Sequence, residues 1–175
     1  MLRHPSFASA ASPARVARST VQIRNVDPQG ADALALLRDA AVEVHALYPE
    51  LFASDAPAPA NPPTPARGVY LVAYRAGQPI ASGALRPLDD RTAEVRRMFV
   101  LKTARRGGIA RAMLAALEEA ALDFGYTRLR LETGDRQANA MALYASEGFA
   151  RCAAFGEHVG DPFSVCFEKD IAAGG

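Results

Sequence analysis

Three apolar segments in the middle of the chain follow one another through very short links. Residues 69–74 and 79–88 are separated only by residues 75–78, a connection that contains Gly77 and is typical of a β-hairpin. A pair of aspartates makes the next turn, into a strand predicted over residues 92–100. Because links this short join neighbouring strands of opposite direction, the three segments predict an antiparallel meander at the centre of the fold.

The segments on either side of this meander alternate between helix and strand. From residue 33 to about residue 47, apolar side chains recur at three- and four-residue steps, the spacing of one helix face. A second helix is predicted from Ile109 to Phe124, closed by Gly125. The remaining predictions are a helix over residues 138–146 and strands over residues 21–26, 129–132 and 165–169. This order predicts a mixed α/β sheet that is at least partly covered on both faces.

Charge and cysteine content exclude several classes of function. The 175 residues include 20 Lys and Arg against 19 Asp and Glu, a formal charge of +1. This balance gives no general field for binding nucleic acid or an anionic membrane, so any anion site must be local. Two cysteines do not make a disulfide framework or a four-ligand zinc site, and no apolar run is long enough to span a bilayer. We therefore expect a cytoplasmic protein without a metal cluster.

Two segments are expected to lie outside the packed core. Residues 1–20 are rich in Ala and Ser, carry arginines and lack acids, which fits either a disordered leader or an organelle transit peptide. Five prolines between residues 57 and 65 exclude the interior of a helix or sheet there. We expect a single domain over residues 21–172, with a Pro-rich loop over residues 54–67 that either lies over the site or extends into solvent.

The junction between the meander and the second helix is the best candidate for a ligand site. Residues 105–108 are Arg-Arg-Gly-Gly and stand directly before that helix. Glycines let backbone amides approach an anion, the helix N-terminus adds partial positive charge, and arginines add charge-assisted hydrogen bonds. The alternative is a plain tight turn with solvated arginines. Since the pattern is neither a P-loop nor the three-glycine dinucleotide fingerprint, it favours a pyrophosphate held mainly by backbone.

The same residues resemble the GCN5-related N-acetyltransferase family, called GNAT. Arg105-x-x-Gly108-x-Ala110 satisfies that family's acetyl-coenzyme A pattern. Tyr144, preceded by Leu and followed four residues later by Gly-Phe, is similar to its second motif. The resemblance implies a mixed, mostly antiparallel central sheet of about six to seven strands with about four helices on its two faces. It also implies direct transfer of acetyl from acetyl-CoA, as co-substrate, to a primary amine.

The resemblance gives the cofactor a place along the junction. The pyrophosphate would lie against the backbone amides, with charge added by the arginines, and the pantetheine arm would pair with the end of the preceding strand. The residues so implied are Met98, Phe99, Val100, Arg105, Arg106, Gly107, Gly108, Ile109, Ala110 and Arg111. Many family members carry Asn where this chain has Gln137, whose amide could still hydrogen-bond the cofactor.

Two residues match catalytic positions of the family. Tyr144 corresponds to the tyrosine that protonates the departing thiolate; the alternative is an aromatic core residue. Glu94 corresponds to a glutamate that accepts the proton of the amine through a water molecule in some members. Arg96 shares a strand face with Glu94, and its guanidinium would stabilise the carboxylate and weaken it as a base. Glu94 is therefore either the base or an ion-pair partner, and Arg96 otherwise binds a carboxylate of the acceptor.

Few residues bear on the acceptor. Glu132 and Thr133 end the strand next to the cofactor strand, and residues 155–162 form a polar loop that either holds a cationic amine or is simply solvated. Together with Arg96 or Arg97 they suggest a small, amino-acid-like acceptor. Two alternatives stay open, a non-catalytic acyl-CoA sensor and an N-acetyltransferase that modifies a protein or peptide. An exposed edge strand would also allow a homodimer.

Overall fold

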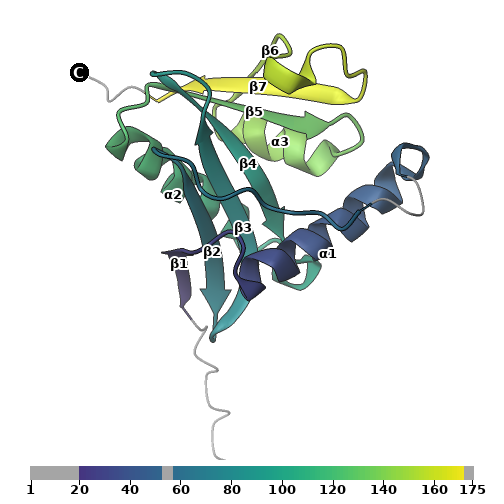
Figure 1. Ribbon diagram of the computed structural model, residues 1–175, viewed down its shortest axis with the longest axis vertical. Coiled ribbons are helices and arrows are strands. Elements are labelled where there is room, and N and C mark those ends of the chain that lie inside the picture. The colour runs from purple at the N-terminus through teal and green to yellow at the C-terminus, as the bar shows by residue number, and fades with distance from the viewer. Residues whose placement is uncertain (1–19, 53–56, 172–175) are drawn as a thin grey trace, which may run out of the picture.

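The computed structural model describes residues 20–52 and 57–171, which form one seven-stranded sheet with helices on both faces (Figure 1). The strands are β1 (Val21–Asn25), β2 (Val69–Arg75), β3 (Gln78–Pro87), β4 (Thr92–Val100), β5 (Arg128–Gly134), β6 (Ala150–Cys152) and β7 (Ser164–Asp170). The helices are α1 (Ala31–Leu47), α2 (Ile109–Asp123) and α3 (Ala138–Ser146), with 3-10 turns η1 (Pro49–Leu51), η2 (Lys102–Ala104) and η3 (Gly156–His158). The strand order is β1-β2-β3-β4-β5-β7-β6, and only β4 and β5 pair in parallel. The predicted mixed, mostly antiparallel sheet is confirmed.

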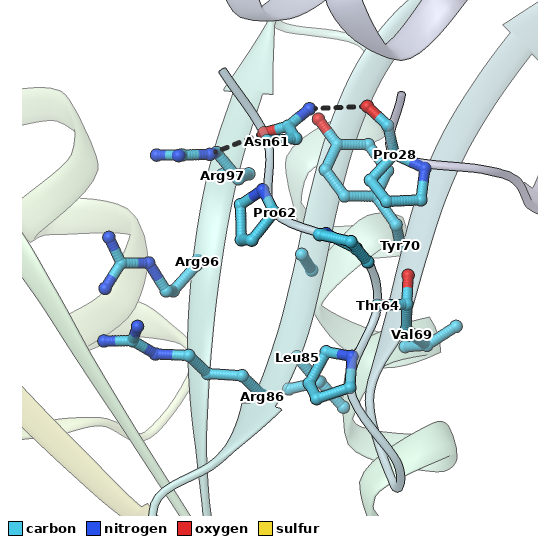
Figure 2. A pocket seen from close by; sticks show the side chains of 13 residues that line it. Pro28, Asn61, Pro62, Thr64, Val69, Tyr70, Leu85, Arg86, Arg96 and Arg97 are labelled. Carbon is cyan, nitrogen blue, oxygen red and sulfur yellow. Dashed lines mark hydrogen bonds between the residues drawn. The ribbon is translucent and has the colours of Figure 1, made fainter. Parts of the chain in front are cut away.

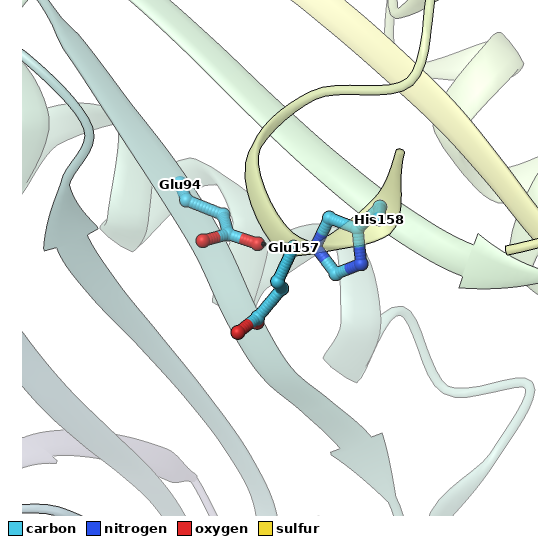
Figure 3. A group of neighbouring side chains, drawn as sticks. All are labelled: Glu94, Glu157 and His158. Carbon is cyan, nitrogen blue, oxygen red and sulfur yellow. Dashed lines mark hydrogen bonds and ion pairs between the residues drawn. The ribbon is translucent and has the colours of Figure 1, made fainter. Parts of the chain in front are cut away.

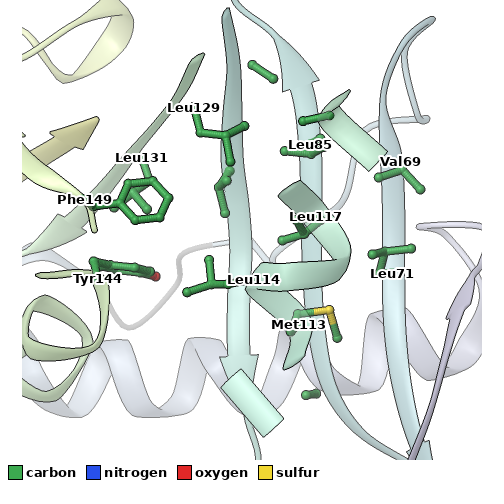
Figure 4. Packing of buried hydrophobic residues seen from close by; sticks show 14 of the residues in the cluster. Val69, Leu71, Leu85, Met113, Leu114, Leu117, Leu129, Leu131, Tyr144 and Phe149 are labelled. Atoms are coloured by element: carbon green, nitrogen blue, oxygen red, sulfur yellow. The ribbon is translucent and has the colours of Figure 1, made fainter. Parts of the chain in front are cut away.

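Strand β2 shows how the two faces are covered. Its side chains alternate between two clusters, so every second residue packs against a different helix. Tyr70, Val72 and Tyr74 pack with Ala33 and Leu36 of α1. On the other face Val69, Leu71 and Ala73 join the main core with Met113, Leu114 and Leu117 of α2 (Figure 4). Burial on both faces explains why this strand is apolar at almost every position.

The number of helices is lower than the family resemblance implied. The described residues contain three α-helices rather than about four. After α1 the chain forms η1 and later crosses the sheet as an extended segment, residues 57–65, which we call the Pro-rich strap (Figure 1). Its prolines lack the amide hydrogen that a helix needs. The strap lies over the sheet.

Most element boundaries agree with the sequence. β4 and α3 have the predicted bounds, whereas β6 and the 3-10 turns are not located by the sequence because such short elements carry little periodicity. Residues 1–19, nearly all of the predicted leader, lie outside the described residues, as do residues 54–56 of the predicted loop. Within residues 20–52 and 57–171, none of the helices has the length and apolar character needed to cross a membrane.

β4 and β5 run side by side for only part of their length. They pair over residues 92–95 of β4 and then separate. A β-bulge follows at once, where Arg97 and Met98 of β4 stand opposite Gly83 of β3. Arg97 has a φ of +58°, and the hydroxyl of Ser82 donates a hydrogen bond to its carbonyl (2.9 Å). Bulges bend a strand and re-aim its side chains, so the sheet opens at this point.

The end of α1 is tied to the link between β5 and α3. The hydroxyl of Tyr48 donates to Asp135 Oδ1 (3.0 Å) and accepts from the backbone N–H of Arg136 (2.7 Å). The Arg136 guanidinium in turn donates to the carbonyl of Leu47 (2.7 Å). Gly134 makes this approach feasible, because a Cβ at that position would lie 2.2 Å from the Tyr48 hydroxyl oxygen.

We expect Gly134→Ala to lower the free energy of unfolding by about 1–3 kcal/mol, the usual cost of overpacking. The strand cannot simply move away, because Gly134 pairs with Ser164 of β7. Urea denaturation measures the change. In a Tyr48→Phe background the same substitution should cost less, since the nearest atom is gone. An equal cost in both backgrounds would contradict the role given to the hydroxyl.

Candidate active site

A cleft of about 420 Å³ opens where β4 and β5 separate. α1 and η1 form one wall, and β4, the end of β5 and α3 form another. Single residues from the surrounding segments complete the lining: Pro59, Tyr70, Ser82, Asp161 and Phe163. The predicted site residues that border it are Arg96, Met98, Phe99, Glu132, Thr133, Gln137 and Tyr144. Glu94, Val100 and residues 105–111 do not border it. The fold thus gathers the predicted tyrosine, the strand end and the acceptor residues around one space.

Tyr144 of α3 borders the cleft although only 5% of its surface is exposed. Its ring packs against Phe149 (Figure 4), with a centroid distance of 5.9 Å. It also packs against Phe167, with a centroid distance of 6.0 Å. Among the described residues, none hydrogen-bonds its hydroxyl. Burial, and then the negative charge of Glu132, raise the pKa of the Tyr144 phenol above its usual value of 10.0. The phenol is therefore protonated at neutral pH and can donate its proton to a group in the cleft.

The loop before α2 presents backbone amides without helical partners. Arg106 and Gly108 have positive φ, +62° and +76°, and the helix begins at the next residue. The backbone N–H of Ala112 donates a hydrogen bond to the carbonyl of Gly108 (3.0 Å). The N–H groups of residues 109–111 precede it and have no acceptor within the helix, as at any helix start. Together with the positive end of the helix dipole, they can hold an anion.

Two predicted arginines of this loop are already paired. Arg105 donates from Nε to the carbonyl of Val100 (2.9 Å) and forms an ion pair with Glu43 of α1 (2.7 Å). Arg111 forms an ion pair with Glu147 (2.9 Å). Arg105 thus ties the loop to the strand end and to α1. The sequence instead predicts that its guanidinium adds positive charge beside the pyrophosphate.

Another arginine reaches the same loop from the meander. A guanidinium nitrogen of Arg75, at the end of β2, lies 3.6 Å from the point where a Cβ on Gly107 would be. The sequence does not single out Arg75, because it meets the loop only through the pairing of the strands. Arg75 is therefore placed to add positive charge beside the amides of the loop, and Arg106 belongs to the loop itself.

Glu94 is buried among charged side chains rather than in the cleft. It is 1% exposed, with Oε2 2.6 Å from Arg86 Nε and Oε1 3.5 Å from Arg96 Nη1. Glu157 contacts the same two guanidiniums, and the hydrogen bond and charge of Arg96, with help from Arg86, lower the pKa of Glu157 to about 2. The ion-pair alternative for Glu94 is thus present in the structure, whereas its role as a base stays a prediction.

His158 lies beside Glu94 and Glu157 (Figure 3) and also faces Glu132. Its Nε2 lies 2.9 Å from Glu94 Oε1, and its Nδ1 lies 4.0 Å from Oε2 of Glu132. Glu132 borders the cleft and accepts a hydrogen bond from the hydroxyl of Ser164 (2.8 Å). The imidazole therefore lies between a buried carboxylate and one that borders the cleft.

The same cluster has the donor atoms of a metal site. Within the described part of the chain, ligand atoms of Glu94, Glu157 and His158 lie within 4.8 Å of one another. Arg86 and Arg96 contact both carboxylates, however, so positive charge already occupies the space that a cation would need. We assign no metal to this cluster.

The Pro-rich strap is fixed to the bulge of β4 (Figure 2). The side chain of Asn61, which is 4% exposed, donates to the carbonyl of Pro28 (2.9 Å) and accepts from Arg97 Nε (2.9 Å). A second cavity of about 120 Å³ lies between strap and sheet and shares Tyr70, Arg96 and Arg97 with the cleft. The sequence points to Arg97 but not to Asn61 or Tyr70, because contacts between distant segments leave no local pattern.

Comparisons with known proteins agree with this geometry. The chain matches the model of the acetyltransferase (GNAT) family over residues 37–149. The IAA acetyltransferase of Azospirillum brasilense is 42% identical over 103 residues, which are 58% of this chain and 67% of that protein.

Solved structures share the whole fold. A Klebsiella pneumoniae protein described as an acyl-CoA N-acyltransferase is 29% identical, with a TM-score of 0.71 over 86% of this chain and 97% of that one. A GNAT acetyltransferase of Elizabethkingia anophelis, solved with acetyl-CoA bound, is 16% identical, with a TM-score of 0.61 over 86% and 97% of the two chains. The family match covers more than half of the chain, from α1 through the loop before α2 to the end of the Tyr144 segment. This chain therefore belongs to the GNAT family of acetyltransferases.

Proposed function

We propose that this acetyltransferase moves the acetyl group of acetyl-CoA directly to the primary amine of a small, amino-acid-like molecule. One observation carries the proposal: Tyr144 is a buried, protonated phenol that borders a cleft and has no hydrogen-bond partner among the described residues. A donor of this kind suits a leaving group that must be protonated as it departs. The thiolate of CoA, with an ordinary thiol pKa of about 8.5, is such a group.

The contacts of the loop before α2 support acetyl-CoA as the acetyl donor. Unpaired amides at residues 109–111, with Arg75 and Arg106 nearby, suit the pyrophosphate. Met98 and Phe99 border the cleft, and beyond residue 95 β4 no longer pairs with β5. The pantetheine arm can therefore lie along this free edge as an added strand would. A relative with the same fold holds acetyl-CoA.

The proposed transfer is a single displacement at the thioester carbonyl. The amine nitrogen bonds to the carbonyl carbon, the C–S bond breaks, and the sulfur receives the Tyr144 proton. An acceptor that enters as an ammonium first gives one proton to a carboxylate at the cleft, which passes it to solvent. After the attack the nitrogen loses its second proton to the same carboxylate, and a neutral amide is left. The products are the N-acetyl compound and CoA, and the phenolate regains its proton from solvent.

We assign the proton acceptor to Glu132 with His158 behind it. Glu132 borders the cleft, whereas Glu94, the other candidate base, is 1% exposed and paired with two guanidiniums. Both carboxylate oxygens of Glu94 are engaged by these guanidiniums and by His158, and they do not border the cleft that holds the amine. In this assignment Glu94 is a positioning residue that holds His158 at 2.9 Å and orients Arg96.

The shape of the cleft favours a small acceptor over a peptide. The Pro-rich strap is fastened to β4 through Asn61, and α1 is tied to the β5–α3 link through Tyr48. Pro59 of the strap and Tyr48 both border the cleft. An extended peptide would need an open groove past these contacts.

Calorimetry with acetyl-CoA, with ATP as a control, followed by thiol release over primary amines and peptides tests the proposal. We expect acetyl-CoA to bind, ATP not to bind, and amino acids or their analogues to be acetylated. Binding without transfer to any amine would show an acyl-CoA sensor. Transfer to peptide N-termini alone would overturn the small-molecule assignment.

A further inference from the structure

We propose that Arg97 forms a subsite for the carboxylate of the acceptor, on the β4 wall of the cleft. This inference rests on the proposed function and names the part of the acceptor that the cleft recognises. The acceptor class is then an amino acid or another small molecule that carries both a primary amine and a carboxylate.

The first argument is the balance of charge around the bulge. Arg86 and Arg96 are paired with the carboxylates of Glu94 and Glu157. Arg97 also borders the cleft, but within residues 20–52 and 57–171 no carboxylate pairs with it. Its hydrogen bonds go to neutral oxygens, Asn61 Oδ1 (2.9 Å) and the carbonyl of residue 60 (3.3 Å). A half-buried guanidinium without a counter-charge is a binding group for an anion.

The surroundings of Arg97 disfavour the positive charge of its guanidinium. Burial, and then the positive charge of Arg96, lower the pKa of the Arg97 guanidinium below its usual 12.5. The group remains protonated at neutral pH, so the cost of burying this charge persists. An anion beside it would relieve both the loss of solvation and the repulsion.

The second argument is the backbone that presents the side chain. Arg97 has a left-handed φ of +58°, uncommon for a residue with a side chain. The bulge opposite Gly83 and the hydrogen bond from Ser82 hold this conformation. Figure 2 shows the guanidinium extending away from the strap, with Nε at the Asn61 end. The strap takes one hydrogen bond from Nε and one from Nη2, through Asn61 and the carbonyl of residue 60. Nη1 and the second hydrogen of Nη2 are left for a carboxylate.

A third observation lies beside Arg97. The hydroxyl of Tyr70 is buried and has no hydrogen-bond partner in the described structure, and Tyr70 borders both the cleft and the cavity under the strap. A buried donor without an acceptor is costly. An anion bound in the space that Tyr70 and Arg97 both border can supply the missing acceptor.

The two walls of the cleft then suit the two ends of one molecule. Glu132 on β5 lies near Tyr144, whose pKa it raises, and marks the place of the amine. Arg97 stands on β4, across the gap left where the strands separate. An acceptor with an ammonium and a carboxylate matches both walls, whereas an amine without the carboxylate leaves Arg97 unpaired.

The test compares acceptors that differ only in the carboxylate. Standard L-amino acids are assayed beside their carboxamides with the wild-type protein, Arg97→Gln, Tyr70→Phe and Arg128→Gln. Arg128 pairs with Asp170 at the far end of β5 and controls for loss of an arginine. Circular dichroism and the KM for acetyl-CoA confirm that each variant is folded and binds its donor.

We expect Arg97→Gln to lower kcat/KM for the best amino acid by about 10- to 100-fold, as for loss of a charged hydrogen-bonded pair. The same variant should leave kcat/KM for the carboxamide within about twofold, and Tyr70→Phe should show a smaller loss in the same direction. Arg128→Gln should behave as the wild type. Equal use of acid and carboxamide by the wild type, or an equal loss for both in Arg97→Gln, would overturn the subsite.

A binding measurement separates this inference from the proposed function. The standard L-amino acids are titrated, in the presence of CoA, into the wild type and Arg97→Gln. Binding that depends on Arg97 without any acetyl transfer would retain the subsite and reject the enzyme assignment. Transfer to amines without preference for a carboxylate would retain the enzyme assignment and reject the subsite. If neither Arg97-dependent binding nor acetyl transfer were found, both the subsite and the enzyme assignment would be rejected.

Discussion

Tyr144→Phe should lower kcat by about 10²- to 10⁴-fold, the usual contribution of a positioned acid. Without the phenol, the thiolate must leave unprotonated or wait for a proton from water. The fold should survive, because the phenyl ring keeps the packing on Phe149 and Phe167 and the hydroxyl has no partner among the described residues to lose. The KM for acetyl-CoA should change little, since the hydroxyl acts on the departing sulfur. Steady-state thiol release and the melting temperature measure these effects.

The pH profile gives this prediction a second readout. Burial and Glu132 raise the pKa of Tyr144 above 10.0, so its protonated form extends to higher pH than that of a free phenol. Loss of the acid form therefore should not limit kcat anywhere between pH 6 and about 10. An early alkaline fall that disappears in Tyr144→Phe would contradict this assignment.

Tyr126→Phe is the matched control. Tyr126 is as buried as Tyr144, but its hydroxyl donates to the carbonyl of Arg67 (3.0 Å) and it does not border the cleft. Loss of this hydrogen bond should lower the free energy of unfolding by about 1 kcal/mol and leave kcat unchanged. If Tyr144→Phe likewise retained kcat, Tyr144 would be an aromatic core residue, the alternative that its place on a helix allows.

The elements that the sequence predicts best are those with a strong local pattern. β4 lies between the aspartate turn and the loop before α2, and α3 begins and ends where predicted. The motif residues Met98, Phe99 and Tyr144 consequently border the cleft. Their position follows from which strand or helix carries them, and strand order is largely set by the short links.

What the sequence cannot place are side chains that meet across the fold. Arg105 has the residue type of a phosphate ligand, yet its guanidinium reaches Glu43 on α1. Asn61 reaches Arg97 only because the strap crosses the sheet, and His158 reaches Glu94 only because η3 turns inward. Neither the strap nor η3 has a periodic pattern, so the charged cluster and the strap contact are visible only in the structure.

Glu132→Gln should lower kcat/KM by about 10²-fold or more at neutral pH, as expected when a positioned base is removed. Glutamine can still accept the hydrogen bond from Ser164, so the local structure should persist. Without the carboxylate, only acceptor molecules that are already uncharged can react. The activity of the variant should therefore rise with pH by about tenfold per unit until the amine is deprotonated.

Glu94→Gln distinguishes the two candidate bases. Glu94 holds His158 and two arginines, so we expect its loss to reduce kcat while the variant keeps the pH profile of the wild type. Glu132→Gln should instead shift the profile to higher pH. The pKa of Tyr144 would also fall towards 10.0 in Glu132→Gln, because one of its two causes is removed, but the phenol would stay protonated at neutral pH. If Glu94→Gln moved the profile and Glu132→Gln did not, the proton would pass to Glu94, and the family position for the base would hold in this chain.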